Sequence, residues 1–253
     1  MSIVDKLVSI ETAKESIKSA ITEKGVDLTG VSFIDYGGKI SEISGGGGSG
    51  DYLEALNEIL NSTTYTSMTA TVVPGHAFGY MYKLTSVNLP ACTTVGIYAF
   101  SGCTSLTSVN LPACTKVYDC AFDYCMSLTS IDLPVCTSIG IDAFSACWSL
   151  TSVNLPACTS IGGSAFYNCS KLTSVNLPVC TSIGSSAFYK CSKLTTVYLS
   201  DVSSVTSLYN SNAFSGCTLL TSIYVPMSLV DAFKSATNWT YFSDKIVGWE
   251  ETV

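Results

Sequence analysis

The sequence predicts a solenoid built mainly from parallel β-strands with short turns and helical pieces, a helical cap at each end and a separate helical module at the N-terminus. The phrase L-T-S-V-N-L-P, or a close variant, occurs seven times. A fixed period of 22 residues, as found here, is typical of solenoid proteins, in which each coil buries its apolar face only by stacking on its neighbours. The 253 residues are 47% hydrophobic, which is enough for a large core. Six of the seven phrases begin 22 residues apart, and the last follows after 26, at Leu84, Leu106, Leu128, Leu150, Leu172, Leu194 and Leu220.

Residues 1–44 are predicted to form the helical module, for attachment or oligomerisation. Apolar residues at Ile3, Leu7, Ile10, Ile17 and Ile21 follow a heptad-like spacing. Two interpretations stay open. Residues 1–24 join copies of the chain into a homo-oligomer, or the helix is amphipathic and folds back on the apolar residues of 26–43.

The segment 45–50 reads G-G-G-G-S-G, which is the composition of a flexible linker. Residues 51–65 follow it, with Leu53, Leu56, Ile59 and Leu60 at helical spacing, and are predicted to form the N-terminal cap. Residues 73–78 already match residues 95–100 one period later, so a degenerate first coil is expected ahead of Leu84.

Residues 66–226 are predicted to form the solenoid itself. In each coil the two apolar residues of V-N-L alternate with polar ones, as in a strand with one buried face. Proline follows, and it ends the strand because it has no N–H for the ladder. A second short extended piece, T-S-I-G, leads into a turn, and A-F then returns apolar groups to the core.

Residues 227–253 are predicted to form the C-terminal cap. The stretch from Ser228 to Ala236 reads as a short helix with a serine N-cap. Its apolar residues Leu229, Ala232 and Phe233 are expected to point inward. An aromatic-rich tail follows and would cover the last coil.

Eleven of the twelve cysteines recur once per coil in two columns, so packing as small apolar core residues is favoured over metal binding or disulfide formation. The chain has no C-x-x-C pair and one histidine, His76, so no metal site and no cofactor are expected. Cys120 falls in a variable column and is expected to be the accessible thiol. Catalytic motifs are missing and the acids are scattered, so the chain is not expected to be an enzyme.

The L-x-x-V-x-L-P and A-F-x-x-C elements of residues 66–226 resemble the leucine-rich repeats of BspA-like bacterial surface adhesins. This resemblance implies a leucine-rich-repeat solenoid with one parallel strand per coil and an exposed face that binds protein or matrix. The segment from Ile17 to Ile40 is similar to a module of phage and prophage tail or appendage proteins of Gram-positive bacteria. That resemblance implies attachment to a virion.

Composition excludes several kinds of partner. There is no arginine and the net charge is −7, so binding to nucleic acid is not expected. No stretch is long and apolar enough for membrane insertion, and the charged first 25 residues do not read as a signal peptide. A virion-associated or cell-surface location is therefore expected.

The candidate binding residues lie on the polar side of the predicted sheet. One column there carries Asn154 and Asn176 and then changes to Tyr198 and Tyr224. The period also lengthens between Leu194 and Leu220, and insertions in solenoids often serve binding. These features predict a contact patch of Tyr198, Tyr209 and Tyr224 with Asn210, Asn154 and Asn176. For the asparagine column the favoured alternative is a surface whose stacked amides and hydroxyls bond one another along the sheet. A second candidate patch is Tyr124, Met126 and Trp148, for which local packing over the turn is an equal alternative.

The sequence thus predicts a non-enzymatic module that recognises a surface protein or glycan, as a component of a phage or prophage tail or appendage. A bacterial cell-surface adhesin is the alternative, and an enzyme is the disfavoured one.

Overall fold

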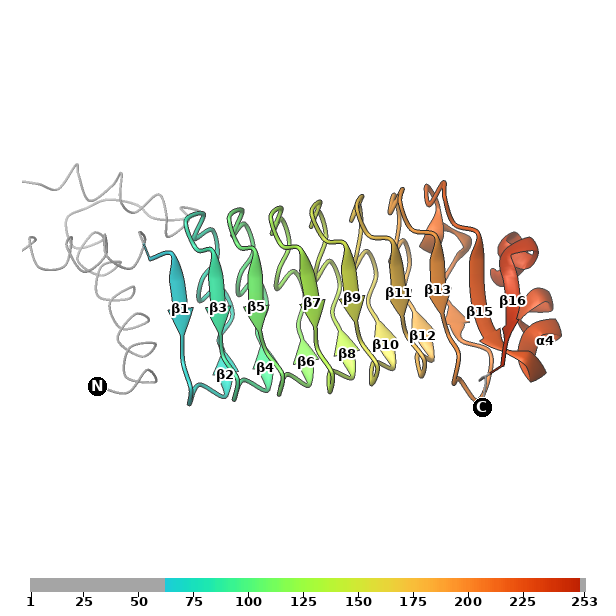
Figure 1. Ribbon diagram of the computed structural model, residues 1–253, viewed down its shortest axis with the longest axis horizontal. Coiled ribbons are helices and arrows are strands. Elements are labelled where there is room, and N and C mark those ends of the chain that lie inside the picture. The colour runs from blue at the N-terminus through green and yellow to red at the C-terminus, as the bar shows by residue number, and fades with distance from the viewer. Residues whose placement is uncertain (1–61, 251–253) are drawn as a thin grey trace, which may run out of the picture. The chain divides into compact units, whose positions relative to one another are not determined.

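The computed structural model describes residues 62–250, which fold as a stack of parallel coils (Figure 1). The predicted module at 1–44, the linker at 45–50 and most of the predicted N-terminal cap lie outside the described residues. From β1 to β14 each coil contributes one three-residue strand and one two-residue strand. Five of the seven turns that join them contain a proline, at Pro90, Pro112, Pro134, Pro156 and Pro178. The predicted solenoid of parallel strands is confirmed.

The three-residue strands, together with the five-residue β15 and the four-residue β16, form what we call the front sheet, in two sections. One section has the order β1-β3-β5 and the other the order β16-β15-β13-β11-β9-β7. All of the pairings are parallel, with each residue paired to the residue one period away. The strands are β1 (Thr64–Thr66), β3 (Ser86–Asn88), β5 (Ser108–Asn110), β7 (Ser130–Asp132), β9 (Ser152–Asn154), β11 (Ser174–Asn176), β13 (Thr196–Tyr198), β15 (Ser222–Pro226) and β16 (Ile246–Trp249).

The two-residue strands form the second sheet, in the order β14-β12-β10-β8-β6-β4-β2. Their apolar second residue is buried and the polar first residue faces outward, as the T-S-I-G pattern predicts. These strands are β2 (Val72–Val73), β4 (Thr94–Val95), β6 (Lys116–Val117), β8 (Ser138–Ile139), β10 (Ser160–Ile161), β12 (Ser182–Ile183) and β14 (Ser207–Leu208).

Identical side chains stack on one another through the core. Seven phenylalanines form a continuous column whose neighbouring ring centroids are 4.9–5.3 Å apart. The rings are nearly parallel, with interplanar angles of 10° or less, so each ring contacts its neighbours face to face along the stack. The column consists of Phe78, Phe100, Phe122, Phe144, Phe166, Phe188 and Phe214.

Two columns of threonine hydroxyls run beside the strands and hold each coil to the one before it. In the first column the hydroxyl of Thr107, for example, donates to the carbonyl of Thr85 at 2.9 Å. In the second, the hydroxyl of Thr115 donates to the carbonyl of Thr93 at 3.0 Å. The same carbonyls also accept backbone amides, as from Thr107 to Thr85 and from Thr115 to Thr93, both at 2.8 Å. The hydroxyls therefore add a further hydrogen bond between neighbouring coils at each of these positions.

A return segment connects each second-sheet strand to the next front strand. In most coils it contains two positions with left-handed backbone conformation, most of them not glycine, and the segment before β15 contains one, Gly216. In one coil these positions are Asp142 and Ala146, with φ of 52° and 54°. Side chains with a Cβ adopt this conformation at a cost, which the stacked backbone hydrogen bonds of the return segments offset. One such bond joins the Asp142 amide to the Gly163 carbonyl at 2.9 Å.

The chain after the last coil forms a 3-10 turn η2 (Met227–Leu229), helix α4 (Val230–Ser235), a 3-10 helix η3 (Trp239–Lys245) and β16. Two predictions for this segment are wrong. The residue before α4 is Leu229 and makes no side-chain cap, because the first turn is taken up by η2. Ala232 is exposed, whereas Phe233 is buried as predicted. Phe233 packs edge to face on Trp239, which lies against Phe214 at the end of the phenylalanine column.

Candidate functional site

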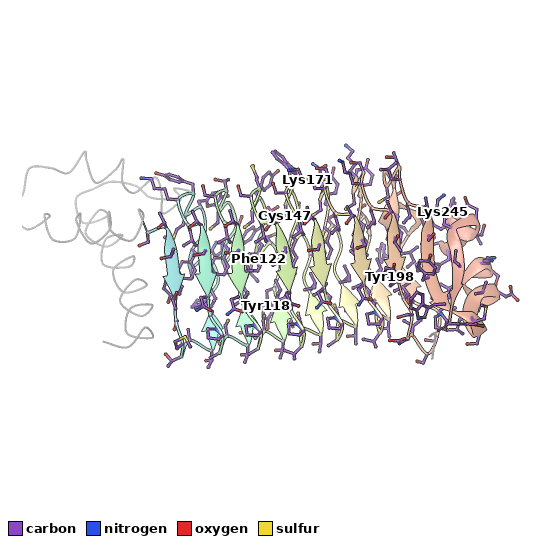
Figure 2. All side chains as sticks on the ribbon, viewed as in Figure 1. Tyr118, Phe122, Cys147, Lys171, Tyr198 and Lys245 are labelled. Carbon is purple, nitrogen blue, oxygen red and sulfur yellow. The ribbon has the colours of Figure 1, made fainter. Side chains whose placement is uncertain are left out.

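An aromatic cluster lies on the solvent side of the front sheet, at its C-terminal end. Tyr198 and Tyr224 stack with ring centroids 5.2 Å apart and an angle of 13° between the rings. Trp249 meets both of them edge to face, at 5.7 and 5.6 Å. The tryptophan side chain is 37% exposed and the tyrosines are half-buried. We call Tyr198, Tyr224 and Trp249 the front aromatic cluster, of which Tyr198 is labelled in Figure 2.

Strand pairing explains how this cluster forms. Tyr198 and Tyr224 are paired residues of β13 and β15, so they occupy one column of the sheet. The chain then passes through α4 and η3 and returns as β16, which pairs with β15 and places Trp249 beside Pro226. Asn176 pairs with Tyr198, and Asn154 pairs with Asn176, so these predicted residues continue the same column.

Tyr209 and Asn210 lie elsewhere. They follow β14 in the second sheet. Among the described residues, the rings of Tyr198 and Tyr224 contact one another and Trp249, and neither contacts the ring of Tyr209. Tyr209 is 75% exposed. The Asn210 amide donates to the Ser185 hydroxyl at 2.8 Å, and its oxygen caps η1 (Ser211–Phe214). The predicted patch is therefore corrected: Trp249, which the sequence reasoning missed, is the third ring beside the two tyrosines.

The extra residues of the last coil do not form a single loop at 206–211. The step from β13 to β14 is three residues longer than the step from β11 to β12. Val202 and Thr206 of this longer step are buried. The Thr206 hydroxyl donates to the Cys180 carbonyl at 2.7 Å, and the Thr206 carbonyl accepts from the Trp239 indole at 2.7 Å. The insertion therefore helps to hold the C-terminal segment.

The asparagine column of the front sheet forms side-chain bonds in places. The Asn110 amide donates to Asn88 at 2.7 Å, and the Asn154 amide donates to Asp132 at 2.8 Å. Each donor belongs to the later coil. The side chain of Asp132 is a carboxylate and has no N–H to donate to Asn110. The front sheet is interrupted at the same place, between β5 and β7.

The second candidate patch lies on the return segments. Tyr124 and Trp148 are 49% and 42% exposed, and Met126 is half-buried. Met126 and Trp148 occupy the same column in neighbouring coils, and the Met126 carbonyl accepts from the Ser149 amide at 3.2 Å. These side chains are thus close enough to contribute to one surface, on a different side of the solenoid from the front aromatic cluster.

The eleven column cysteines are buried and free, which confirms their packing role. The thiols of one column donate to the phenylalanine carbonyls of the preceding coil, as in Cys147 to Phe122 at 3.3 Å. Burial raises the pKa of Cys103 to about 12 and that of Cys147 well above its ordinary value, so these two thiols are poor nucleophiles. Cys120 is half-buried. Burial also raises its pKa, and its contact with the Tyr98 hydroxyl lowers the pKa in part.

Three acids that the sequence shows as scattered come together on the return segments. Burial of the Asp142 carboxyl and then like-charge repulsion from Asp119 raise the pKa of Asp142. The Asp123 pKa is raised to about 6, first by burial of its carboxyl and then by Asp142, although contacts with the Ser145 side chain and the Tyr124 amide oppose this shift. One of its oxygens is buried without a hydrogen-bond partner.

We expect Asp123→Asn to stabilise the protein at pH 7.5 by about 1 kcal/mol and to have almost no effect at pH 4. The folded pKa of about 6 lies above the unfolded value of 3.8, so the carboxyl favours folding below pH 4 and this contribution is lost as the pH rises through 6. The full shift is discounted because the carboxyl is half-exposed to solvent. Urea denaturation in 0.3 M salt at both pH values measures the difference, with Asp201→Asn as the exposed control. Equal effects at the two pH values would contradict the assignment.

Within residues 62–250, no three His, Cys, Asp or Glu side chains are arranged to hold a metal ion. His76 stacks on Tyr98 with ring centroids 5.1 Å apart. None of the described helices is both long enough and apolar enough to cross a membrane.

Comparison with known proteins gives a consistent result. The profile of the BspA type leucine rich repeat region matches residues 71–178 and 137–243, in six copies. A leucine-rich repeat protein of Treponema pallidum has a similar crystal structure, with 31% identity, a TM-score of 0.59, and coverage of 63% of this chain and 78% of that chain. No curated protein matches the chain.

Two further solved structures are more distant. A leucine-rich repeat protein from Bacteroides ovatus is 21% identical, with a TM-score of 0.39 over 75% of this chain and 67% of that one. A leucine-rich cell surface protein from Faecalibacterium prausnitzii is 18% identical, with a TM-score of 0.33 over 76% of this chain and 88% of that one.

Proposed function

Because this chain belongs to the BspA-type leucine-rich repeat family, we propose that it is a non-enzymatic binding module that recognises a protein partner through the front aromatic cluster. Repeats of this family generally serve as protein-binding or surface-adhesion modules. The observation that carries the proposal is the set of three contacting rings on a sheet face whose other outward positions from β1 to β13 are serine, threonine, asparagine and one aspartate, Asp132.

The chemistry of the cluster suits a protein contact. Aromatic side chains supply a large apolar area at a small cost in conformational entropy, and they dominate the binding energy of many interfaces. Here the rings already hold one another in place, so little ordering is required when a partner binds. The neighbouring Asn154 and Asn176 offer hydrogen bonds at the rim of the cluster.

A glycan is the second candidate for the same site. Sugar rings stack on aromatic faces, and neutral amides and hydroxyls bond their hydroxyl groups. The front sheet presents these two features side by side, with Asn176 paired to Tyr198.

The proposed role in the cell follows from the N-terminal residues. We propose that residues 1–44 attach the module through the linker at 45–50, either to a phage or prophage tail or appendage or to a bacterial cell envelope. The support is the resemblance of the segment from Ile17 to Ile40 to tail modules and of the repeats to adhesins. We further propose that α4, η3 and β16 cap the last coil. Immunogold labelling of virions and of intact cells would separate the two locations.

The proposed binding site is tested by screening the full chain on arrays of matrix proteins and glycans. For any ligand found, the variant Tyr198→Ala/Tyr224→Ala/Trp249→Ala is expected to bind at least thirtyfold more weakly, because such anchors contribute about 2 kcal/mol or more to binding. The matched control is Tyr209→Ala/Tyr241→Ala, in which both tyrosines are highly exposed and lie outside the cluster. The control should bind normally. Equal affinity of both variants would place the site elsewhere, and turnover of the bound ligand would overturn the non-enzymatic role.

A further inference from the structure

The return segments form a third side of the solenoid, and here the repeats differ most from one another. We call this side the return face. It consists of residues 75–83, 97–105, 119–127, 141–149, 163–171, 185–193 and 209–219, one segment per coil. Neighbouring return segments are joined by backbone bonds, such as that from the Phe144 amide to the Ala165 carbonyl at 2.8 Å. The face is therefore a continuous, ordered surface.

Charge is divided along this face. Between residues 117 and 149 the charged side chains are all aspartates, and those of the return face are Asp119, Asp123 and Asp142. Between residues 150 and 200 the charged side chains are all lysines, and all three lie on the return face, at Lys171, Lys190 and Lys193. Segments 119–127 and 141–149 are thus acidic and segments 163–171 and 185–193 are basic, while Lys83 lies outside these four segments, near the N-terminal end of the face.

The positions across the face are also ordered. Segments 119–127 and 185–193 are each separated by one residue from the preceding second-sheet strand and by two residues from the following front strand, so their first and last residues lie at opposite edges. Asp119 is the first residue of its segment, and Lys193 is the last residue of its own. In Figure 2 Lys171, also a last residue, lies at the upper edge of the solenoid, and Tyr118, which directly precedes Asp119, lies well below it.

We propose that two copies of this chain pair in antiparallel orientation through their return faces. The two-fold axis would pass between the segments 141–149 and 163–171. Such an axis reverses the direction along the solenoid and the direction across the face. Segment 119–127 of one copy then faces segment 185–193 of the other, and segment 141–149 faces segment 163–171.

Under this symmetry the charges of the two copies meet. The first position of segment 119–127 faces the last position of segment 185–193, and the middle positions face each other. The pairs are Asp119 with Lys193, Asp123 with Lys190 and Asp142 with Lys171 of the second copy, each within the reach of a lysine side chain. Every pair occurs twice, because the interface is isologous.

The uncharged side chains are complementary in size as well. Trp148 and Met126 would face the small residues Ser164 and Ser186 of the second copy. At the outer end, Ile97 would face Leu219, and these two apolar side chains are 45% and 52% exposed. Exposed apolar residues that meet across a symmetric contact are typical of a protein interface.

A second copy explains the pattern better than an unrelated basic partner does. A basic partner would account for the aspartates alone, whereas pairing between copies uses the aspartates, the lysines and the spacing between them. Both sets lie on one face, and each acidic segment has a basic segment at the symmetric position. Front aromatic clusters lie on another side of the coil and would stay free in the pair.

Charge reversal in the full chain tests the proposal, by sedimentation velocity from 1 to 100 μM in 50 mM and 500 mM NaCl. The wild type is expected to dimerise, and more weakly at high salt. Lys190→Glu/Lys193→Glu and Asp119→Lys/Asp123→Lys should each weaken dimerisation at least tenfold. An equimolar mixture of the two variants should form dimers again, because all facing charges are then opposite. A monomeric wild type at 100 μM, or dimerisation that both reversals leave unchanged, would overturn the proposal.

Crosslinking provides a test of geometry. In a Cys120→Ser background, Asp119→Cys/Lys193→Cys is expected to give a disulfide-linked dimer with oxidised glutathione. The two positions cannot join within one chain, because three coils at about 4.8 Å each separate them. The matched control Asp119→Cys/Ser105→Cys should stay monomeric on a non-reducing gel. If copies instead assembled through residues 1–24, the two double-cysteine variants would give equal amounts of crosslinked dimer. That result would also contradict the proposed contact. Ala substitutions in the front aromatic cluster should leave the dimer intact, so this proposal and the proposed function can fail separately.

Discussion

Replacing Phe144 with alanine is expected to lower the free energy of unfolding by about 4 kcal/mol, the range measured for large-to-small changes at buried aromatic residues. Phe144 is fully buried, and its ring stacks on Phe122 and Phe166 at 5.2 and 5.3 Å. The substitution removes two ring contacts at once and leaves a cavity between rigid neighbours. Urea denaturation followed by circular dichroism measures the loss.

The control lies three residues earlier in the same return segment. Ile141 is 53% exposed, so Ile141→Ala should change stability by less than about 0.5 kcal/mol. A loss below about 1.5 kcal/mol for Phe144→Ala would show that the phenylalanine column is not the main source of cohesion between coils.

A second large effect is expected at the C-terminal end, where Trp239→Ala should cost about 4 kcal/mol. The indole is 1% exposed, donates to the Thr206 carbonyl and packs against Phe214, Phe233 and Phe242. Coils contact only their neighbours, so the loss should be local. Hydrogen exchange should accelerate in residues 206–249 while the coils before residue 150 stay protected.

Tyr241→Ala is the matched control, since this aromatic residue lies in η3 with Trp239 and is 70% exposed. It should leave both global stability and local exchange nearly unchanged. Uniform acceleration along the whole solenoid in Trp239→Ala would contradict the local role of the C-terminal segment.

The repeat period was sufficient to predict the two strands of each coil and the burial of the cysteine and phenylalanine columns. These features depend on contacts between equivalent positions of neighbouring coils, and residues one period apart in the sequence occupy such positions. The left-handed positions of the return segments could not be predicted in this way. Glycine occupies them at Gly102 and Gly216, but tyrosine, alanine and aspartate occupy others, because the stacked neighbours impose the conformation.

The candidate site shows the same limit. Tyr198 and Tyr224 share a column, so the sequence predicts their proximity. Trp249 joins them only because β16 returns to pair with β15 after an irregular segment. Asp119, Asp123 and Asp142 come together because their positions differ within the period while their segments adjoin in space. Contacts made by the segment after the last coil, and contacts between different positions of the repeat, depend on the path of the chain in space. The repeat period alone does not predict them.

The stacked columns also bear on how the length of this protein can change. Every coil presents the same phenylalanine, cysteine and threonine positions to both of its neighbours, so the loss or gain of 22 residues leaves all columns in register. Nearly identical repeats favour such exchanges during recombination of the gene. A variant that lost residues 150–171 would keep a continuous core, but its basic segment would lie one coil closer to its acidic one. The number of coils, which is inherited with the gene, would then determine which variants of the chain have matching charge positions and can still pair.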